Sequence, residues 1–223
     1  MHSWIQNHIL LELTLHQTRR YSELRPRDVE GNLFMYHLKG LMREGLVTKD
    51  DQAYTLSDQG LRFIGTYSLK IGRTRQQPKI LTAVVARNDI GEFLFTKWGR
   101  QPNIGQISFP HGMMHYGQGV KSMAAHELAE KTGLEANLHY IGDVYVRGMQ
   151  ADLVDRHMLV HVFEAKDIHE GSNDLMQPEI YESFWAKLEN LDQSQFVPGF
   201  YEIAQIAQNH KNIPFFEDIV ISI

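Results

Sequence analysis

A helix predicted near the middle of the chain carries two carboxylates and a lysine on one face. Glu127, Glu130 and Lys131 stand at positions i, i+3 and i+4, and residues with this spacing lie side by side on a helix. The helix is expected over residues 120–132, which contain no proline or glycine, and Gly133 follows at a typical stop position. Carboxylates are ligands of hard cations such as Mg²⁺, which also binds substrate phosphates. Such a face offers ligands of the kind that a metal ion with a phosphate needs, but two glutamates at this spacing have little specificity by themselves.

Lys131 reduces the negative charge of this face. It leaves the three side chains with one net negative charge, where Glu127 and Glu130 alone would carry two. A glutamate followed four residues later by a lysine is also the favoured order for a helical ion pair, worth about 0.2–0.5 kcal/mol. We therefore expect Lys131 to neutralise Glu127 in part and to weaken the binding of a divalent ion. An open alternative is that both glutamates only form the solvated face of an amphipathic helix.

The spacing around this helix resembles the Nudix box, G-x5-E-x7-R-E-U-x-E-E-x-G-U, in which U is an aliphatic residue. Six fixed positions of the pattern are matched, by Gly112, Glu127, Leu128, Glu130, Gly133 and Leu134. Gln118, His126 and Lys131 stand where the pattern has Glu, Arg and Glu. The resemblance implies a Nudix α/β/α sandwich with a mixed sheet. It also implies a pyrophosphohydrolase, acting on nucleoside diphosphates linked to a second group X, with Mg or Mn held by glutamates.

The resemblance also assigns roles to single residues. Glu127 and Glu130 are the implied catalytic residues, with Glu127 acting on the attacking water, and Glu127, Glu130 and Glu182 are the implied metal ligands. Glu179 is an alternative to Glu182, and an acidic loop without a role is the other reading of that segment. The last glutamate of the box, a chief metal ligand, is Lys131 here, so we expect Mg or Mn to bind weakly. Arg147 is a candidate ligand-binding residue, and His126 is expected to take the packing place of the box arginine.

The flanking sequence predicts the strands of such a fold. Residues 80–86 form a β-branched apolar run, and a turn cluster separates them from a second strand at 92–98. Further strands are expected over 138–146 and 157–165, and a closing helix over 200–210. Zinc is a further alternative, because imidazole suits zinc and four histidines occur in this region: His111, His115, His126 and His157. No two of them have the i, i+4 geometry of a zinc site on a helix, since His111 and His115 are expected in a loop.

The first 66 residues have a different pattern. Helices are expected over 5–15, over a short stretch that Ser22 caps, and from Asn32 to Gly45, followed by a hairpin and a helix that Ser57 caps. This order, with the run Tyr36-His37-Leu38-Lys39, resembles a winged helix-turn-helix of bacterial repressors of the metal-sensor and multidrug-sensor kind. By position, the resemblance implies contacts to DNA bases and phosphates from these residues: Arg25, Arg27, Asn32, Tyr36, Lys39, Arg43 and Lys49.

The charge of this segment limits its affinity for DNA. Residues 1–66 hold eight Lys plus Arg and eight Asp plus Glu, and a DNA-binding domain usually has a basic face. Because phosphate contacts dominate affinity, a neutral module binds weakly alone and depends on dimerisation. A winged helix that binds a protein partner is therefore the alternative.

Residues 68–78 are polar, carry only positive charges and end in proline, so we expect a linker between a winged-helix domain (1–67) and a Nudix-like domain (79–223).

Composition excludes several classes of protein. The 223 residues include no cysteine, so disulfides, thiolate metal sites and cysteine nucleophiles are excluded. No apolar run approaches the roughly 20 residues of a membrane span and no signal-peptide pattern is present, so a cytoplasmic protein is expected. The net charge of −5 excludes a generally basic nucleic-acid coat.

Two functional hypotheses remain. The first is a homodimeric transcription regulator that binds double-stranded DNA and senses a nucleoside or sugar diphosphate in a weakened Nudix domain. It resembles the Nudix-related repressors of NAD metabolism, although the winged helix comes first here. The second is an active Mg-dependent Nudix pyrophosphatase in which the winged helix serves assembly. A scaffold with two inert modules is a third, weaker hypothesis.

Overall fold

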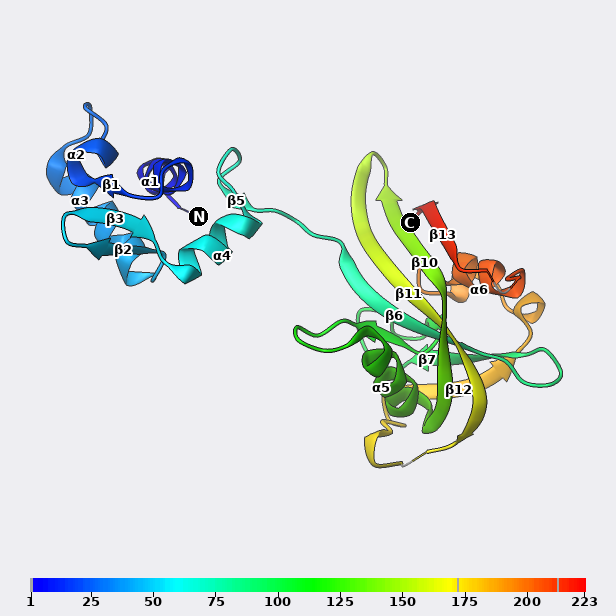
Figure 1. Ribbon diagram of the computed structural model, residues 1–223. Helices are drawn as coiled ribbons and strands as arrows, with labels where there is room; N and C mark the ends of the chain where they lie inside the picture. Colours follow the sequence, from blue (N-terminus) through cyan, green and yellow to red (C-terminus); the bar gives the residue numbers. More distant parts are fainter. Residues whose placement is uncertain (1, 172, 212) are drawn as a thin grey trace. The chain divides into compact units, whose positions relative to one another are not determined.

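The computed structural model describes residues 2–171, 173–211 and 213–223. The chain divides into two compact units, Met1–Gln76 and Gln77–Ile223, whose elements are labelled in Figure 1. The part of the chain that the structure describes contains no helix long and apolar enough to cross a membrane.

The N-terminal unit has the predicted order of helices and hairpin. Its elements are α1 (Trp4–Leu15), β1 (Arg19–Arg20), α2 (Tyr21–Leu24), α3 (Gly31–Arg43), β2 (Val47–Asp50), β3 (Ala53–Leu56) and α4 (Asp58–Thr66), and its strands form a sheet in the order β1-β3-β2. The predicted cap of the last helix is confirmed, because the Ser57 side chain accepts a hydrogen bond from the Gly60 backbone. The predicted cap of the short helix is wrong: α2 begins at Tyr21 after Arg20, and Ser22 lies inside it.

The helices of this unit pack around one apolar core. Its largest fully buried side chains come from α1, α2 and α3: Ile5, Ile9, Leu10, Leu24, Phe34, Leu38 and Leu41. On α3 the buried positions recur every three or four residues, so the opposite face of that helix is turned to solvent.

Part of the segment predicted as a linker is folded in the N-terminal unit. The strands β4 (Tyr67–Ser68) and β5 (Arg73–Thr74) pair in an antiparallel hairpin. Tyr67 is buried, its hydroxyl donates to Asn7 Oδ1 over 2.9 Å, and its ring stacks on Phe63 with centroids 4.7 Å apart. The unit therefore extends past residue 67, to Gln76.

The C-terminal unit is a mixed α+β fold. Its elements are β6 (Lys79–Ala86), β7 (Phe93–Trp98), β8 (Ile107–Ser108), β9 (His111–Met113), α5 (Val120–Thr132), β10 (Leu134–Gln150), β11 (Leu153–Glu170), β12 (Tyr181–Ala186), α6 (Phe200–Gln208) and β13 (Phe215–Ser222). A five-stranded sheet has the order β13-β10-β11-β6-β9, and a three-stranded sheet has the order β12-β7-β8. The larger sheet is mixed, because β10 with β13 and β11 with β6 are parallel pairs and its other pairs are antiparallel.

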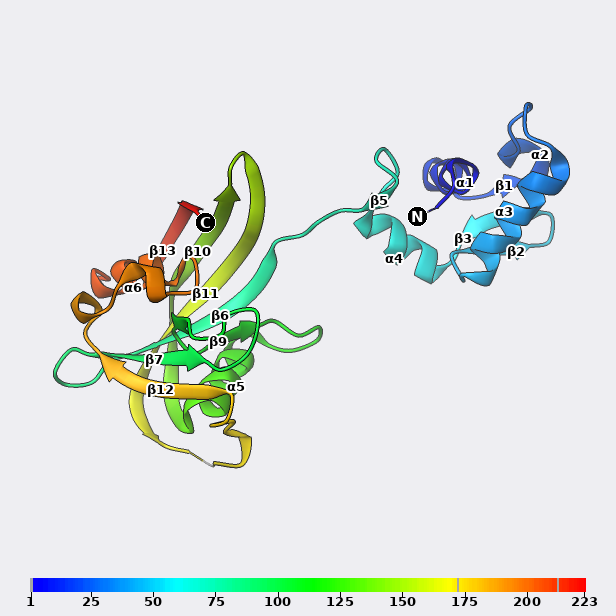
Figure 2. The ribbon, with the colours of Figure 1, turned by 180° about the vertical axis from the view of Figure 1, so that it is seen from behind.

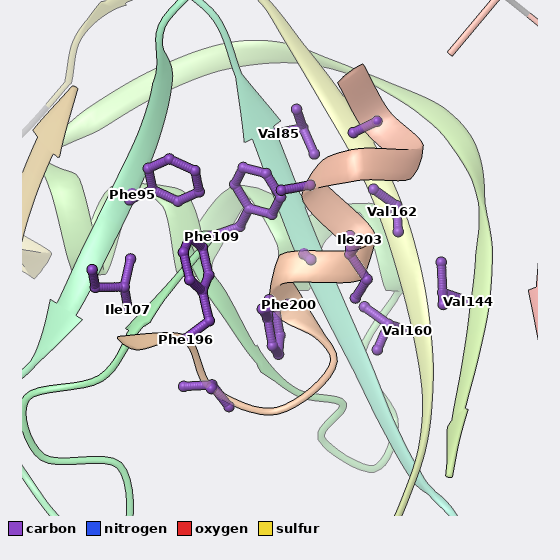
Figure 3. Close-up of a cluster of buried hydrophobic side chains, with 14 of the residues drawn as sticks. Val85, Phe95, Ile107, Phe109, Val144, Val160, Val162, Phe196, Phe200 and Ile203 are labelled. Carbon is purple, nitrogen blue, oxygen red and sulfur yellow. The ribbon is translucent and has the colours of Figure 1, made fainter. Parts of the chain in front are cut away.

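Helices α5 and α6 cover opposite faces of the larger sheet, as comparison of Figures 1 and 2 shows. Neighbouring residues of a strand point to opposite faces, and Val162 packs in the α6 cluster whereas Phe163 packs in the α5 cluster. Figure 3 shows the α6 side, where Phe200 and Ile203 lie over Val160, and where Phe95 of the smaller sheet belongs to the same cluster. This packing fixes both helices on the sheet, and with them the side chains described next.

The predicted strands are present but their lengths differ. The strands expected over 138–146 and 157–165 are parts of β10 and β11, which have 17 and 18 residues and pair along nearly their whole length. Strand β13 was not predicted; its sequence, FFEDIVIS, has no regular alternation of polar and apolar residues, and the strand lies at the edge of the larger sheet.

Candidate functional site

Gly112 allows the carboxylate of Glu127 to approach the sheet. Gly112 lies in β9 opposite Thr82 of β6, and a Cβ atom at position 112 would overlap the Glu127 carboxyl group. Glu127 is only 6% exposed, and its helix α5 packs on both β6 and β9. Two matched positions of the predicted box are thus coupled physically, since the glycine makes the space that the glutamate fills.

The ammonium group of Lys131 lies between the two glutamates of α5. Its Nζ donates to Glu127 Oε2 and, over 3.2 Å, to Glu130 Oε2. Lys131 is 2% exposed, so its pair with the buried Glu127 is shielded from water, whereas the Glu130 side chain is 21% exposed. The other oxygen of Glu130 accepts from Gln177 Nε2 over 2.8 Å. The predicted ion pair is confirmed. Because the pair is buried, removing one partner would leave an unpaired charge, which typically costs about 3–5 kcal/mol.

Two aromatic rings flank this ion pair. Lys131 Nζ lies 4.7 Å from the centre of the Tyr181 ring and 5.7 Å from that of Trp98. The guanidinium of Arg100 lies over the same rings, at 5.7 Å from Trp98 and 5.8 Å from Tyr181. Ring faces attract cations, so Trp98 and Tyr181 hold both positive groups at the site.

His111 is a buried, neutral histidine. Its ring lies 4.2 Å from that of Phe200, and its Nδ1 lies 3.1 Å from the Phe109 carbonyl and 3.0 Å from Ser108 Oγ. Because a carbonyl can only accept, Nδ1 carries the proton. Burial lowers the pKa of His111 to about 3; the Phe109 hydrogen bond opposes this shift, and the charge of Lys131 adds to it. The side chain is a packing and hydrogen-bonding group of β9 and bears no charge near neutral pH.

A cavity of about 630 Å³ opens beside these residues; it is called the α5 cavity below. Helix α5, the β7–β8 loop, and the starts of β6 and β11 all contribute to its walls. Among the residues that line it are Lys79, Trp98, Arg100, Asn103, His111, Gly112, His115, His126, Glu127, Glu130, Lys131, Asp155, Arg156, His157 and Phe200. The cavity thus combines aromatic surface, carboxylates and several cationic side chains, which is the chemistry of a site for a phosphorylated ligand.

The donor set of this cavity does not fit a divalent ion. Nudix hydrolases typically use Mg or Mn, but the described ranges contain no group of three or more His, Asp or Glu residues that could hold a metal ion. Glu127 and Glu130 both bind Lys131. Glu182, predicted as a third ligand, is exposed on β12 opposite Lys97 and does not line the cavity. The alternative Glu179 is also exposed and does not line it.

Other predicted site residues fall both inside and outside the cavity. His126 is exposed on α5 and lines it, whereas Gln118 lies in the turn before α5, where its backbone N–H donates to His115 O over 3.1 Å. Gly133 ends α5 in the left-handed conformation, with φ of 70°, as predicted. Arg147, predicted to bind ligand, pairs with Asp218 of β13 at 3.0 Å and does not itself line the cavity, although it stands opposite His157, which does.

The residues predicted to contact DNA are all exposed. Four of them stand at helical spacing on the solvent face of α3: Asn32, Tyr36, Lys39 and Arg43. Lys49 lies on β2, and Arg25 and Arg27 follow α2. This arrangement is compatible with the predicted contact surface, and the contact itself stays a prediction.

Several residues of the site were not identified from the sequence. Trp98 was predicted only as a strand residue, and Arg100, Asn103 and Tyr181 received no role. The Oδ1 atom of Asn103 is buried without a hydrogen-bond partner, and so is His157 Nε2. The β7–β8 loop that carries Arg100 and Asn103 follows no fixed pattern, so no signal in the sequence identifies these two residues.

Comparison with known proteins places this fold in a defined class. The profile of the NUDIX domain matches residues 78–205, just over half of the chain. The chain therefore belongs to the NUDIX domain family. A NUDIX hydrolase from Nitrosomonas europaea superposes with a TM-score of 0.52 at 16% identity, over 62% of this chain and 94% of that one. The fold is thus that of Nudix hydrolases.

Two further structures show the same kind of coverage with lower scores. The MutT NUDIX hydrolase from Burkholderia pseudomallei gives a TM-score of 0.48 at 20% identity, over 60% of this chain and 98% of that one. The MutT protein from Methanosarcina mazei Go1 gives 0.44 at 22% identity, over 61% and 99%. No curated protein matches the chain.

Proposed function

We propose that this protein is a Nudix hydrolase-type protein that binds a nucleoside diphosphate linked to a second group X in the α5 cavity and hydrolyses it slowly. Family membership supports the reaction class, and the observation that carries the proposal is the buried Lys131 between Glu127 and Glu130. A protein cation at this place neutralises part of the acidic cluster, so phosphates meet less repulsion than at an intact set of glutamates.

The same lysine limits the chemistry of Glu127. A carboxylate that takes a proton from an attacking water must have an oxygen within hydrogen-bond reach of that water. Glu127 Oε2 already accepts from Lys131, and the whole residue is buried against Gly112. Arg100 and Arg156, which also line the cavity, can bind phosphate oxygens as two-pronged donors. Binding is therefore expected to exceed turnover.

Binding and hydrolysis can be measured on the same full-length protein. ADP-ribose is titrated by calorimetry in EDTA and in Mg²⁺, and phosphate-containing products are followed over time in both buffers. We expect binding in EDTA and slow product release that Glu127→Gln reduces further. Fast, strictly metal-dependent turnover by the wild-type protein would contradict the proposal and make it an ordinary Nudix pyrophosphatase.

A second candidate function concerns the N-terminal unit. The exposed row of Asn32, Tyr36, Lys39 and Arg43 on α3 favours DNA binding, and with it a dimeric regulator that senses the diphosphate. The ligand would act by binding one arrangement of the dimer more tightly than another. Binding of duplex DNA from the protein's own operon, measured at several salt concentrations, tests this function. Lys39→Ala and Arg43→Ala should each weaken binding and reduce its salt dependence; unchanged binding would remove α3 as the contact.

A further inference from the structure

We propose that Asn103 makes the α5 cavity selective for a nucleobase that carries an amino group. This inference rests on the proposed function, because it takes a nucleotide as the occupant of the cavity. Asn103 is 9% exposed and lines the cavity, and its Oδ1 is buried without a hydrogen-bond partner. A buried acceptor that has lost water and gained no partner is destabilising, so a ligand that brings an N–H donor to it gains a hydrogen bond at little cost.

The loop that carries Asn103 is held in place by its backbone. Trp98 N–H donates to Gln106 O over 2.9 Å, and Gln106 N–H donates to Asn103 O over 2.9 Å. At the start of the loop, Gly99 N–H donates to Ile180 O, just before β12. These bonds fix the backbone of Asn103 before any ligand arrives, so less ordering of the loop is required on binding.

The surroundings of Asn103 suit both halves of a nucleotide. Trp98 lines the cavity and supplies an aromatic ring for a base, whereas Phe200 is fully buried behind it. Arg100 and Arg156 supply positive charge for phosphates. Among the described residues neither arginine forms an ion pair, in contrast to Lys131, whose charge is shared by two glutamates. His157 Nε2 is a second buried polar atom in the same cavity without a partner, so the cavity lining offers two unused hydrogen-bonding groups.

Because Asn103 Oδ1 can only accept a hydrogen bond, it distinguishes bases that carry a donor from bases that do not. Oδ1 only accepts, and the exocyclic amine of adenine donates. Hypoxanthine has a carbonyl at the same position, which would place two acceptors against each other. A base without either group would leave Oδ1 unpaired. Sites that hydrogen-bond a ligand group reject analogues that lack it, because the buried partner is then left unsatisfied.

Three nucleotides that differ at one position test the proposal. ADP, purine riboside 5′-diphosphate, which lacks the amine, and IDP, which has a carbonyl there, are titrated by calorimetry into the full-length protein in EDTA. We expect ADP to bind about tenfold more tightly than either analogue, the size of one hydrogen bond to a buried acceptor.

A pair of variants assigns the selectivity to Asn103. Asn103→Leu should lose the preference for ADP and bind the three nucleotides with similar affinity. Asn190→Leu is the matched control, because Asn190 is exposed in a short 3-10 helix (Leu188–Asn190) and does not line the cavity. Thermal unfolding of both variants checks that they fold, and the comparison of three ligands on the wild-type protein needs no variant.

The outcomes separate this inference from the proposed function. Equal affinity of the wild-type protein for ADP and purine riboside diphosphate would overturn the role of Asn103 and leave nucleotide binding intact. Tighter binding of IDP would also overturn it, since the amide would then present its NH₂ group. No binding of any of the three nucleotides, or of ADP-ribose, would overturn the proposed function itself.

Discussion

The carboxylate of Glu127 lies against Gly112, in the space that a Cβ atom at position 112 would fill. One residue of a strand and one of a helix are thereby matched in size, fifteen positions apart in the sequence. The close approach brings Glu127 to the sheet and leaves Lys131, one helical turn further on, pointing to the same carboxylate.

Gly112→Ala should therefore destabilise the C-terminal unit by about 1–3 kcal/mol, the usual cost of overpacking a filled site. The added methyl group has to displace the Glu127 carboxylate and with it the ion pair to Lys131. Urea unfolding followed by tryptophan fluorescence measures the change. Gly65→Ala is the control, because nothing lies within 4 Å of a Cβ at that helical glycine. Equal stability of Gly112→Ala and the wild type would show that Glu127 moves freely.

Lys131→Glu should create a binding site for Mg²⁺ or Mn²⁺. Three acidic side chains would then face each other on α5, and without an ion their repulsion should lower the free energy of unfolding by about 3–5 kcal/mol, as expected for loss of a buried pair. Calorimetric titration with Mn²⁺ measures the gain. Lys131→Met removes the charge and keeps most of the stem, so it should show no comparable gain. If Lys131→Glu binds Mn²⁺ no better than wild type, Lys131 does not cause the weakness of the site.

The stability of the protein should fall as the pH falls from about 6.5 towards 3, in part because of His111. Burial lowers the pKa of this residue to about 3, whereas an unfolded histidine titrates near 6.5. Between these values the unfolded chain binds a proton that the folded chain does not, so stability rises with pH by up to about 1.4 kcal/mol per unit. His111→Gln should flatten this slope in unfolding experiments at pH 4, 5, 6 and 7. His115→Gln, at an exposed histidine, should leave it unchanged; equal slopes in wild type and His111→Gln would contradict a buried neutral histidine.

Glu182→Gln should leave product release from ADP-ribose within about twofold of the wild-type rate, because Glu182 is exposed outside the α5 cavity. Glu127→Gln should reduce the same rate clearly more than Glu182→Gln, but by less than the roughly 100-fold of an unhindered general base, because Lys131 already occupies Glu127 Oε2. Timed chromatography of the products compares the two variants directly. A loss in Glu182→Gln as large as that in Glu127→Gln would place Glu182 in the reaction site.

Local features of the site followed from the sequence. The bounds of α5 match the predicted 120–132, and Lys131 pairs with Glu127 because four residues bring two side chains together on any α-helix. Strands β6 and β7 were also predicted, since their apolar runs are separated by a cluster of turn residues. These predictions needed only the geometry of one element at a time.

The environment of the ion pair could not be predicted in this way. Tyr181 and Trp98 meet Lys131 only because β12, which lies beside α5, pairs with β7 and places Tyr181 opposite Trp98. Glu182 follows Tyr181 on the same strand, and successive side chains of a strand point to opposite faces, so the aromatic neighbour faces the site while the predicted ligand faces solvent. Asn103 belongs to a loop whose position depends on long-range backbone bonds.

A positive charge that is part of the polypeptide has a fixed stoichiometry: each folded chain carries one. Lys131 cannot diffuse away or exchange for another ion, and its burial keeps solutes from reaching it. Saturation of such a site should then track the amount of its ligand alone, whatever the level of free magnesium around it.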